Sequence, residues 1–254
     1  VDDDSGCSFG LRGIQIMNER KKDQEKNDGL YLKRIARIRS DFPTKFGIPR
    51  QSGLVPELRA KIVFEPEYRR REALEGLEGY SHIWLIWEFS EAVREGWSAT
   101  VRPPRLGGNT RRGVFATRSP FRPNALGLSC VELAAISEEP GEGMVLWVSG
   151  ADLMDGTPIY DIKPYLPFAD AYPQARAGFA GEVESYHLEV DFPRSLQSAF
   201  SGEQVQALIK LLAADPRPAY QRDPERIYGM PFAGKDIRFR VADGRLTVQE
   251  IMDL

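Results

Sequence analysis

The chain has 254 residues, 42% of them hydrophobic, and a formal net charge of -3, so it is long enough for a principal domain with a smaller companion. Its two cysteines, Cys7 and Cys130, are too few for a disulfide framework or a zinc site. It has no apolar stretch of about eighteen residues that could span a membrane, and it begins with acidic residues where a secretory signal would be basic and then apolar. We therefore expect a cytoplasmic protein without a metal site or a membrane segment.

Strand patterns dominate the first two thirds of the chain. After a charged N-terminal stretch, short runs rich in Val, Ile and aromatic residues end at Gly, Pro, Asn or Asp, which is typical of strands. The predicted strands are residues 31–39, 61–64, 80–89, 113–118, 127–136, 144–150 and 158–163. Residues 80–89 (YSHIWLIWEF) have no polar face, which predicts a central strand covered on both sides. One helix is predicted over residues 66–79, with Pro66 in its first turn and Gly76 or Gly79 at its end. Many short strands with few helices favour a closed or nearly closed barrel.

The last third of the chain predicts a second unit. Residues 164–181 are rich in Pro, Ala and Gly, which indicates a linker. A strand at 183–192, a long amphipathic helix at 195–215 and a hairpin that turns at Asp243-Gly244 are predicted to follow. This mixture predicts a small α+β domain at the C-terminus.

Arginines are concentrated between residues 94 and 122. This segment contains seven arginines and one acidic residue, Glu95, although the chain as a whole is acidic. A guanidinium group presents a planar fork of donors that fits phosphate or carboxylate at two points. Because Pro and Gly interrupt the segment repeatedly, most of it is predicted to be shaped loop. The segment favours recognition of a polyanion, and the alternative is a basic surface that pairs with carboxylates elsewhere in the chain.

Common catalytic motifs are missing, since the sequence has no GxxxxGK, GxSxG, HExxH or CxxC pattern. His187 is interpreted as structural, and for His82 a structural role at a strand end is favoured over a catalytic base. Asp152 and Asp155 flank a turn that directly follows a predicted strand. They either form that turn or supply carboxylates to a cation or to ribose hydroxyls.

Six motifs, in order, resemble the TsaA-like family. They are IPRQSGL (48–54), SHIW (81–84), TVRPPRLGGN (100–109), GVFATRSPFRPNALGLS (113–129), DLMDGTPIYDIKPYLPF (152–168) and DPRPAY (215–220). The match extends from about residue 31 to the C-terminus. Within the family, the motifs resemble in particular the bacterial tRNA methyltransferases that act on N6 of threonylcarbamoyladenosine at position 37. The resemblance implies a methyltransferase that uses S-adenosylmethionine, binds the tRNA anticodon loop and forms a homodimer with the cofactor site near the subunit boundary.

The resemblance also implies a fold and a division into domains. The fold is mainly β, a single-sheeted β-barrel with a small α+β C-terminal domain that helps to hold the tRNA. We expect a variable N-terminal extension at residues 1–28, the TsaA-like barrel at 29–168 and the C-terminal domain at 169–254.

Candidate site residues are carried over from the same motifs. The cofactor-binding candidates are Pro49, Arg50, Gln51, Phe89, Ser90, Arg118, Leu128, Asp152, Leu153, Met154 and Asp155. The tRNA-binding candidates are Arg102, Arg105, Arg111, Arg112, Arg122, Arg217 and Tyr220. Arg217 and Tyr220 are also the catalytic candidates, against the simpler interpretation that DPRPAY only stops the preceding helix. No general base is identified. A tRNA-binding module without catalysis and an enzyme that uses S-adenosylmethionine in another reaction stay open as alternatives.

Overall fold

The computed structural model describes residues 30–92, 96–103, 110–183, 186–217 and 223–254. The chain divides into two compact units, Val1–Lys33 and Arg34–Leu254. Within the first unit only residues 30–33 are described, and Leu30 and Tyr31 are highly exposed there. Every helix and strand below belongs to the second unit.

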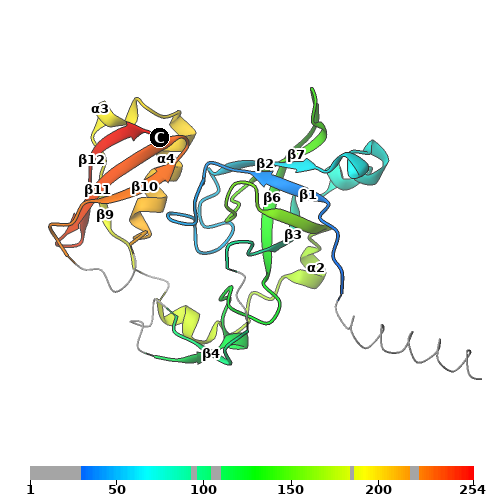
Figure 1. The fold of residues 1–254 in the computed structure, drawn as a ribbon, viewed down its shortest axis with the longest axis horizontal. Coiled ribbons are helices and arrows are strands. Elements are labelled where there is room, and N and C mark those ends of the chain that lie inside the picture. Colours follow the sequence, from blue (N-terminus) through cyan, green and yellow to red (C-terminus); the bar gives the residue numbers. More distant parts are fainter. Residues whose placement is uncertain (1–29, 93–95, 104–109, 184–185, 218–222) are drawn as a thin grey trace, which may run out of the picture. The chain divides into compact units, whose positions relative to one another are not determined.

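Six antiparallel strands form a closed barrel in the order β1-β2-β7-β6-β3-β8 (Figure 1). They are β1 (Ala36–Arg39), β2 (Arg59–Phe64), β3 (His82–Glu88), β6 (Leu126–Glu139), β7 (Gly143–Ser149) and β8 (Pro158–Pro164). The ring closes because β8 pairs with β3 on one side and with β1 on the other, where Ala36 lies opposite Ile159. The predicted mainly β fold class is confirmed, and strand β1 is shorter than the predicted strand 31–39.

Side chains alternate between the barrel interior and its outer surface. On β3, Ile83, Leu85 and Trp87 are buried in the interior, whereas Trp84 faces outward and is half-buried. The prediction that this strand is covered on both sides is therefore wrong, because only one face of a barrel strand points inward. The outer face of β3 is apolar as well, because Trp84 has partners there. Its ring packs beside the Tyr165 ring, 5.8 Å between centroids, and its Nε1 donates to Asp170 Oδ2 at 3.0 Å.

The helix predicted at residues 66–79 is wrong. The segment forms three short 3-10 turns, η1 (Pro66–Tyr68), η2 (Arg71–Leu74) and η3 (Leu77–Gly79). Gly76 adopts a left-handed φ of 86° between the last two turns, and Arg69 donates to the carbonyl oxygens of Phe64 and Gly141. Only Leu74 is buried within the three turns, so the segment lacks the continuous apolar face that holds a surface helix to its core.

The strand predicted at residues 113–118 is also wrong. Its start belongs to β5 (Arg112–Gly113), which pairs with β4 (Thr100–Val101) in a two-stranded sheet, and η5 (Val114–Ala116) follows. Val114 is buried while Phe115 is 71% exposed. One buried side chain cannot fix a longer strand against a sheet.

The C-terminal part contains a four-stranded sheet and one main helix. The sheet order is β10 (Tyr228–Phe232), β11 (Lys235–Ala242), β12 (Arg245–Asp253) and β9 (Glu189–Asp191), with β9 parallel to β12. The predicted hairpin at Asp243-Gly244 is confirmed, and both residues have positive φ, as a tight turn of this type requires. Strand β10 was not predicted, because Gly229 and Pro231 interrupt its apolar pattern. The strand predicted at 183–192 is reduced to β9.

The long helix predicted at 195–215 is two helices, α3 (Arg194–Gln197) and α4 (Gly202–Ala213). Ser201 and Gln204 form a capping box that starts α4, since each side chain bonds the other residue's backbone N–H. A capping residue inside the predicted helix therefore divides it. The predicted linker also contains structure, the short helix α2 (Pro167–Asp170) and η6 (Gly178–Val183).

The segment between β1 and β2 packs into the core of the C-terminal sheet. Phe42, Val55 and Leu58 are buried in one cluster with residues of α4, β10, β11 and β12. Ala233 N also donates to Asp41 O at 2.9 Å, and Lys210 pairs with Glu57. Because this segment also contains residues 48–51, the C-terminal core supports one wall of the cavity described next.

No helix within the described ranges is both long enough and apolar enough to cross a membrane.

Candidate functional site

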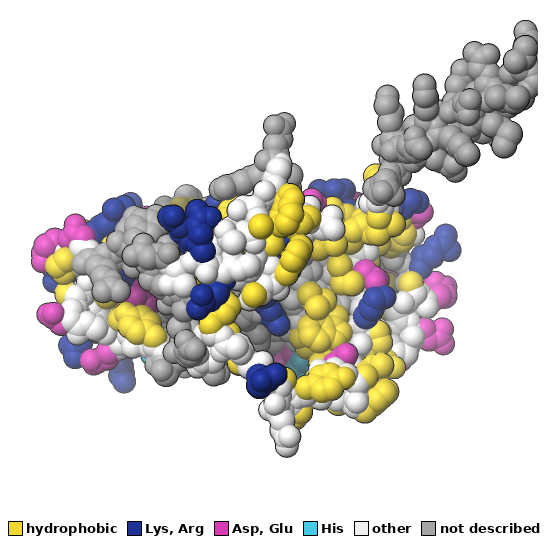
Figure 2. Space-filling model, turned by 90° about the horizontal axis from the view of Figure 1, so that it is seen from below, with side chains coloured by type: hydrophobic (Ala, Val, Ile, Leu, Met, Phe, Trp, Pro, Cys, Tyr) yellow, Lys and Arg dark blue, Asp and Glu magenta, His cyan; other side chains and the backbone are white. Residues whose placement is uncertain are grey.

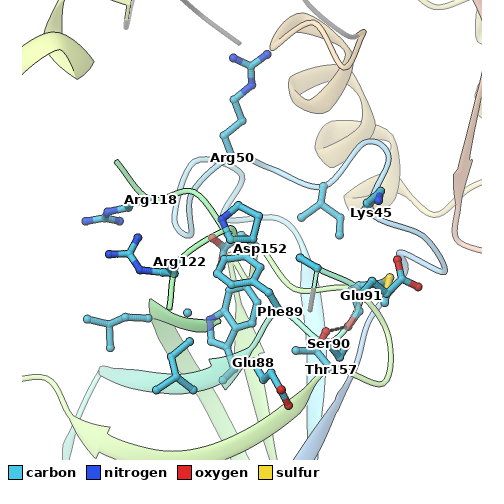
Figure 3. A pocket seen from close by; sticks show the side chains of 18 of the residues that line it. Lys45, Arg50, Glu88, Phe89, Ser90, Glu91, Arg118, Arg122, Asp152 and Thr157 are labelled. Carbon is cyan, nitrogen blue, oxygen red and sulfur yellow. Dashed lines mark hydrogen bonds between the residues drawn. The ribbon is translucent and has the colours of Figure 1, made fainter. Parts of the chain in front are cut away.

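A cavity of about 690 Å³ opens at the end of the barrel (Figure 3). Its walls come from the segment between β1 and β2, the end of β3, residues 117–122, the start of β6 and the turn after β7. A volume of this size is typical of sites for small molecules and cofactors. Nine of the eleven cofactor-binding candidates line it: Pro49, Arg50, Gln51, Phe89, Ser90, Arg118, Leu128, Asp152 and Met154. The structure brings these residues together, and their role in binding stays a prediction.

The cavity has an apolar aromatic wall. The rings of Trp87 and Phe89 lie 4.3 Å apart between centroids, with an angle of 59° between their planes. Leu126 and Leu128 line the same cavity, and each of them is at least 37% exposed. These apolar surfaces suit a flat ring more than a fully hydrated ion.

Asp152 supplies a partly buried carboxylate to the cavity. Burial raises the pKa of this carboxyl group above its ordinary value, while hydrogen bonds from Ser129 Oγ and from the backbone N–H of Ser52, and the charge of Arg118, oppose that rise. Arg118 also donates to Gln51, which connects residues 117–122 to the segment between β1 and β2. In Figure 3, Arg118 and Arg122 lie on the same side of the cavity.

The side chains of Leu153 and Asp155 do not line the cavity. Leu153 is 1% exposed and belongs to the barrel core. Asp155 Oδ1 accepts from the Ser40 backbone N–H at 3.1 Å, and Oδ2 lies 3.6 Å from Arg39 Nη1. Asp155 and Gly156 form the turn before β8, with Gly156 at a φ of 77°. The turn-forming interpretation is therefore correct for Asp155, and the ligand-binding interpretation suits Asp152.

Sequence reasoning missed several residues of the cavity, among them Lys45, Trp87, Glu88 and Glu91. Tyr160 Oη donates to Glu88 Oε2 at 2.5 Å, and burial together with this bond raises the pKa of Tyr160 to about 12. The Glu88 carboxylate points away from Asp152 (Figure 3). Glu88 and Glu91 directly flank Phe89 and Ser90 in the sequence. Since Phe89 and Ser90 were already assigned to the site, this adjacency could have identified both glutamates. His82 lies at the opposite end of β3 and does not line the cavity.

The described arginines of the basic segment divide into two groups: Arg118 and Arg122 line the cavity, and the other three do not. Arg122 lines the cavity and donates to the carbonyl oxygens of Thr117 and Ser119, so it also shapes the loop. Arg102, Arg111 and Arg112 are exposed. Arg111 donates to Thr100 Oγ1 at 2.9 Å, and the Arg112 guanidinium lies over the Phe179 ring. Arg105 lies outside the described residues. One face of the molecule carries basic side chains interspersed with exposed apolar ones (Figure 2).

The start of DPRPAY lies next to the cavity wall. Asp215 follows α4 with a φ of 55°, and Arg50 Nη2 donates to its carbonyl oxygen at 3.4 Å. Arg217 donates two hydrogen bonds to the Asp215 carboxylate, at 2.8 and 2.9 Å, and its side chain is only 10% exposed. Burial raises the pKa of Asp215, but the bonds and charge of Arg217 outweigh it and hold that pKa below its ordinary value. Tyr220 lies outside the described residues.

The predicted helix stop is confirmed, since α4 ends at Ala213. The same motif makes an ion pair beside the cavity, because Arg217 closes on Asp215, whose carbonyl oxygen accepts from the cavity residue Arg50. A helix stop alone would not require that pair.

These features define a class of protein: a small β-barrel whose cavity suits an organic molecule with an apolar ring and charged groups, beside an exposed arginine-rich segment. No group of three or more His, Cys, Asp or Glu residues suited to a metal ion occurs within the described parts of the chain.

Comparisons with known proteins identify the family. The family profile described as the tRNA-methyltransferase O N-terminal domain matches residues 37–171, and the one described as the TrmO C-terminal domain matches residues 185–254. The chain belongs to the tRNA-methyltransferase O family, which confirms the resemblance seen in its motifs.

Individual relatives agree with this membership. The chain is 40% identical over 225 residues to the tRNA (adenine(37)-N6)-methyltransferase of Escherichia coli, covering 85% of this chain and 95% of that protein. It is 43% identical over 213 residues to a putative S-adenosylmethionine-dependent methyltransferase of Pseudomonas aeruginosa, covering 81% of this chain and 90% of the relative. The crystal structure of TrmO from Pseudomonas aeruginosa matches with a TM-score of 0.70 at 33% identity, over 88% of this chain and 98% of that one.

Proposed function

We propose that this protein transfers a methyl group from S-adenosylmethionine to N6 of adenine 37 in the anticodon loop of tRNA, in nucleosides that carry the threonylcarbamoyl group. The observation that carries this proposal is family membership across both parts of the chain. A second observation supports the proposal, namely that nine of the predicted cofactor-binding residues line one cavity. The threonylcarbamoyl group is the finer part of the proposal, and the motifs of the sequence are what support it.

The residues around the cavity fit S-adenosylmethionine. Trp87, Phe89 and Leu128 offer an apolar slot for adenine. The Asp152 carboxylate suits ribose hydroxyls or the ammonium group, and it lessens the cost of burying a positive charge nearby. Arg50 or Arg118 suits the carboxylate of the amino-acid part. When bound there, the cofactor supplies an electrophilic methyl group.

The protein's contribution to the reaction is alignment. The N6 lone pair is delocalised into the purine ring and the carbamoyl group, so this nitrogen is a poor nucleophile. Holding N6 in line with the methyl carbon and the sulfur supplies much of the acceleration, since positioning effects are worth up to about 7 to 11 kcal/mol. The cofactor held in this cavity would supply the methyl group to N6 and leave as S-adenosylhomocysteine, and the N6 proton would pass to solvent during or after the transfer, since no general base is identified.

The basic segment and DPRPAY are assigned to the tRNA. Arg102, Arg111 and Arg112 are exposed and suit backbone phosphates, and Arg122 at the cavity suits the carboxylate of the threonylcarbamoyl group. Anticodon loops present single-stranded bases, so one nucleotide can enter a pocket at modest unstacking cost. Arg105 and Tyr220 are included in this assignment on the strength of the sequence motifs alone.

We assign catalysis and cofactor binding to residues 29–168 and tRNA holding to residues 169–254, with residues 1–28 as a variable extension. We further propose that the protein acts as a homodimer in the cytoplasm. Exposed apolar side chains support a second subunit, since Leu128 in the cavity wall is 55% exposed and Phe115 is 71% exposed.

Methylation assays test the proposal directly. Protein is incubated with labelled S-adenosylmethionine and tRNA from cells with or without the threonylcarbamoyl modification, and the labelled nucleoside is then mapped. We expect label at position 37 of the modified tRNA only. Label in both tRNAs would refute the requirement for the threonylcarbamoyl group, and tRNA binding without label would indicate a module without catalysis.

Binding of S-adenosylhomocysteine provides the companion test, because it needs no tRNA. A ligand at 100 times its dissociation constant adds about 2.7 kcal/mol to the free energy of unfolding. We expect both calorimetric binding and this stabilisation with the protein alone. If neither is observed, the cofactor assignment is wrong.

A further inference from the structure

A chain of two hydrogen bonds leads from Trp87 through Ser129 to Asp152, starting in the barrel interior. Trp87 Nε1 on β3 donates to Ser129 Oγ on β6 at 2.9 Å, and Ser129 Oγ donates to Asp152 Oδ1 at 2.6 Å. Ser129 is 1% exposed and Trp87 is 7% exposed. Because both donors are shielded from solvent, water competes weakly for either bond.

The direction of both bonds follows from the chemistry of the donors. An indole N–H can only donate, so Ser129 Oγ accepts from Trp87. The hydroxyl has a single proton, and Asp152 Oδ1 lies within hydrogen-bond distance on its other side, so this proton is directed to Asp152. A hydrogen bond donated to the charged form favours that form, so Ser129 acts against the rise in pKa that burial causes at Asp152.

Gly127 allows the indole to reach Ser129. It lies opposite Trp87 in the pairing of β3 with β6, two residues before Ser129 on the same face of the strand. A Cβ atom at position 127 would lie 2.7 Å from Trp87 Cδ2 and still closer to two other ring atoms. The glycine therefore leaves the space in which the ring lies across β6 with its N–H directed at the hydroxyl.

Other charged groups surround the cavity and bear on any titration there. They are Lys45, Arg50, Glu88, Glu91, Arg118 and Arg122. Arg118 acts directly on Asp152 and favours its ionised form, whereas Glu88 is held by Tyr160. Asp155, in the same turn, is engaged with Ser40 and Arg39. Ser129 is the donor to Asp152 that approaches from the barrel interior.

We propose that Ser129 is a positioning residue: its hydroxyl, oriented by Trp87, holds the Asp152 carboxylate ionised and facing the cofactor cavity. Ser129 does not itself line the cavity, so it acts on the ligand only through Asp152. This inference rests on the proposed use of S-adenosylmethionine, since the carboxylate is held for the hydroxyl or ammonium groups of that cofactor.

Ser129→Ala removes the donor and Ser149→Ala is the matched control. Ser149 on β7 is 2% exposed, accepts from Arg59 Nη1 at 2.6 Å and does not line the cavity. The two variants therefore lose a hydroxyl of similar burial from the same barrel. Ser129→Cys, which keeps the shape with a weaker donor, serves as a second variant if Ser129→Ala does not fold.

The first measurement is the pKa of Asp152 in the protein without ligand, from the pH titration of its ¹³C-labelled carboxyl signal. Asp152→Asn identifies that signal. We expect Ser129→Ala to raise this pKa by about one to two units, and Ser129→Cys to raise it less, because a hydrogen bond to the charged form is lost or weakened. Ser149→Ala should leave it unchanged. An unchanged pKa in Ser129→Ala, or an equal rise in Ser149→Ala, overturns the inference.

The second measurement is the affinity for S-adenosylhomocysteine across pH. Affinity should fall as pH drops through the pKa of Asp152, so the fall should begin at higher pH in Ser129→Ala than in the wild type or Ser149→Ala. Coincident affinity profiles in the two serine variants would count against the inference. If the wild type binds no S-adenosylhomocysteine at any pH, the proposed function fails, while the carboxyl titration still decides the role of Ser129.

Discussion

The cavity and the arginine-rich segment hold their charged groups in different ways. Asp152 is partly buried and fixed by Ser129, with Arg118 close by. Arg111 and Arg112 are exposed, and the hydrogen bonds described for their side chains go to Thr100 and to the backbone of Arg111. The contrast suggests that the small-molecule site is formed before its ligand arrives, whereas the surface for a polyanion keeps its guanidinium groups in solvent. Preorganised polar groups help to hold a ligand in a fixed orientation, whereas exposed charges raise the rate at which a charged partner associates.

The largest change is expected for Gly127→Ala, which disturbs the hydrogen bonds that fix Asp152 at the cavity. The added methyl group overlaps the Trp87 ring, so the ring must move away from Ser129. We expect a loss of about 1 to 3 kcal/mol in the free energy of unfolding from overpacking, together with weaker binding of S-adenosylhomocysteine. Denaturant unfolding and calorimetry measure the two effects. Gly202→Ala is the control, because an added Cβ atom meets nothing within 4 Å there; equal losses in both variants would remove the explanation.

Arg217→Ala should abolish most tRNA methylation. This substitution removes the ion pair between Arg217 and Asp215 beside the cavity. Removing the guanidinium also leaves Asp215 without its two strongest hydrogen bonds, which should cost about 1 to 3 kcal/mol of stability. Tyr220→Ala should lose methylation while keeping cofactor binding. Methyl incorporation at saturating cofactor, beside an unfolding curve, separates these results.

Arg226→Ala is the matched control for Arg217, since both guanidinium groups lie over the Tyr228 ring. Near-normal turnover in both Arg217→Ala and Tyr220→Ala would contradict a catalytic role for DPRPAY and leave only its interpretation as a helix stop.

Arg118→Ala should weaken S-adenosylhomocysteine binding by about tenfold, equivalent to about 1.4 kcal/mol. The reason is that Arg118 lines the cavity, bonds Gln51 and favours the ionised form of Asp152. The salt dependence of tRNA binding should change little. Calorimetric titration gives the first quantity and filter binding at several salt concentrations gives the second.

The smallest effects are expected for Arg111→Ala and Arg112→Ala. Each should reduce the slope of log affinity for tRNA against log salt concentration by up to about one phosphate contact, with cofactor affinity close to that of the wild type. If both variants and Arg118→Ala gave the same pattern, the division between a fixed cofactor site and an exposed RNA surface would be wrong.

The sequence was sufficient where local patterns are strong. Short runs rich in Val, Ile and aromatic residues located β3, β6, β7 and β8, and Asp243-Gly244 located a hairpin. It failed where the decisive partner is remote in sequence. Ser129 looks like an ordinary strand residue until β3 brings Trp87 beside it. Arg217 looks exposed in its motif, but the turn at Asp215 folds it onto its neighbour's carboxylate.

The motifs selected residues that share one cavity even where the secondary structure was predicted wrongly, because motif resemblance does not depend on helix or strand propensity. It assigned residues 49–51 and 152–155 to one pocket, although the side chain of Leu153 lies in the barrel core. It also missed Trp87 and Glu88, which are cavity residues contributed by the end of a strand. Alternation along β3 could have predicted that Trp87 faces inward, but not which end of the barrel is open.

The segment between β1 and β2 limits where this chain can be cut. Its residues Phe42, Val55 and Leu58 are buried among side chains of the C-terminal sheet and α4, while its residues 48–51 line the cavity. A barrel prepared alone, ending near residue 168, would expose those three side chains to water and leave the cavity wall without support. An engineer who wants a minimal enzyme would have to redesign that segment with polar residues first, because truncation alone would leave residues 48–51 of the candidate site without the core that supports their segment.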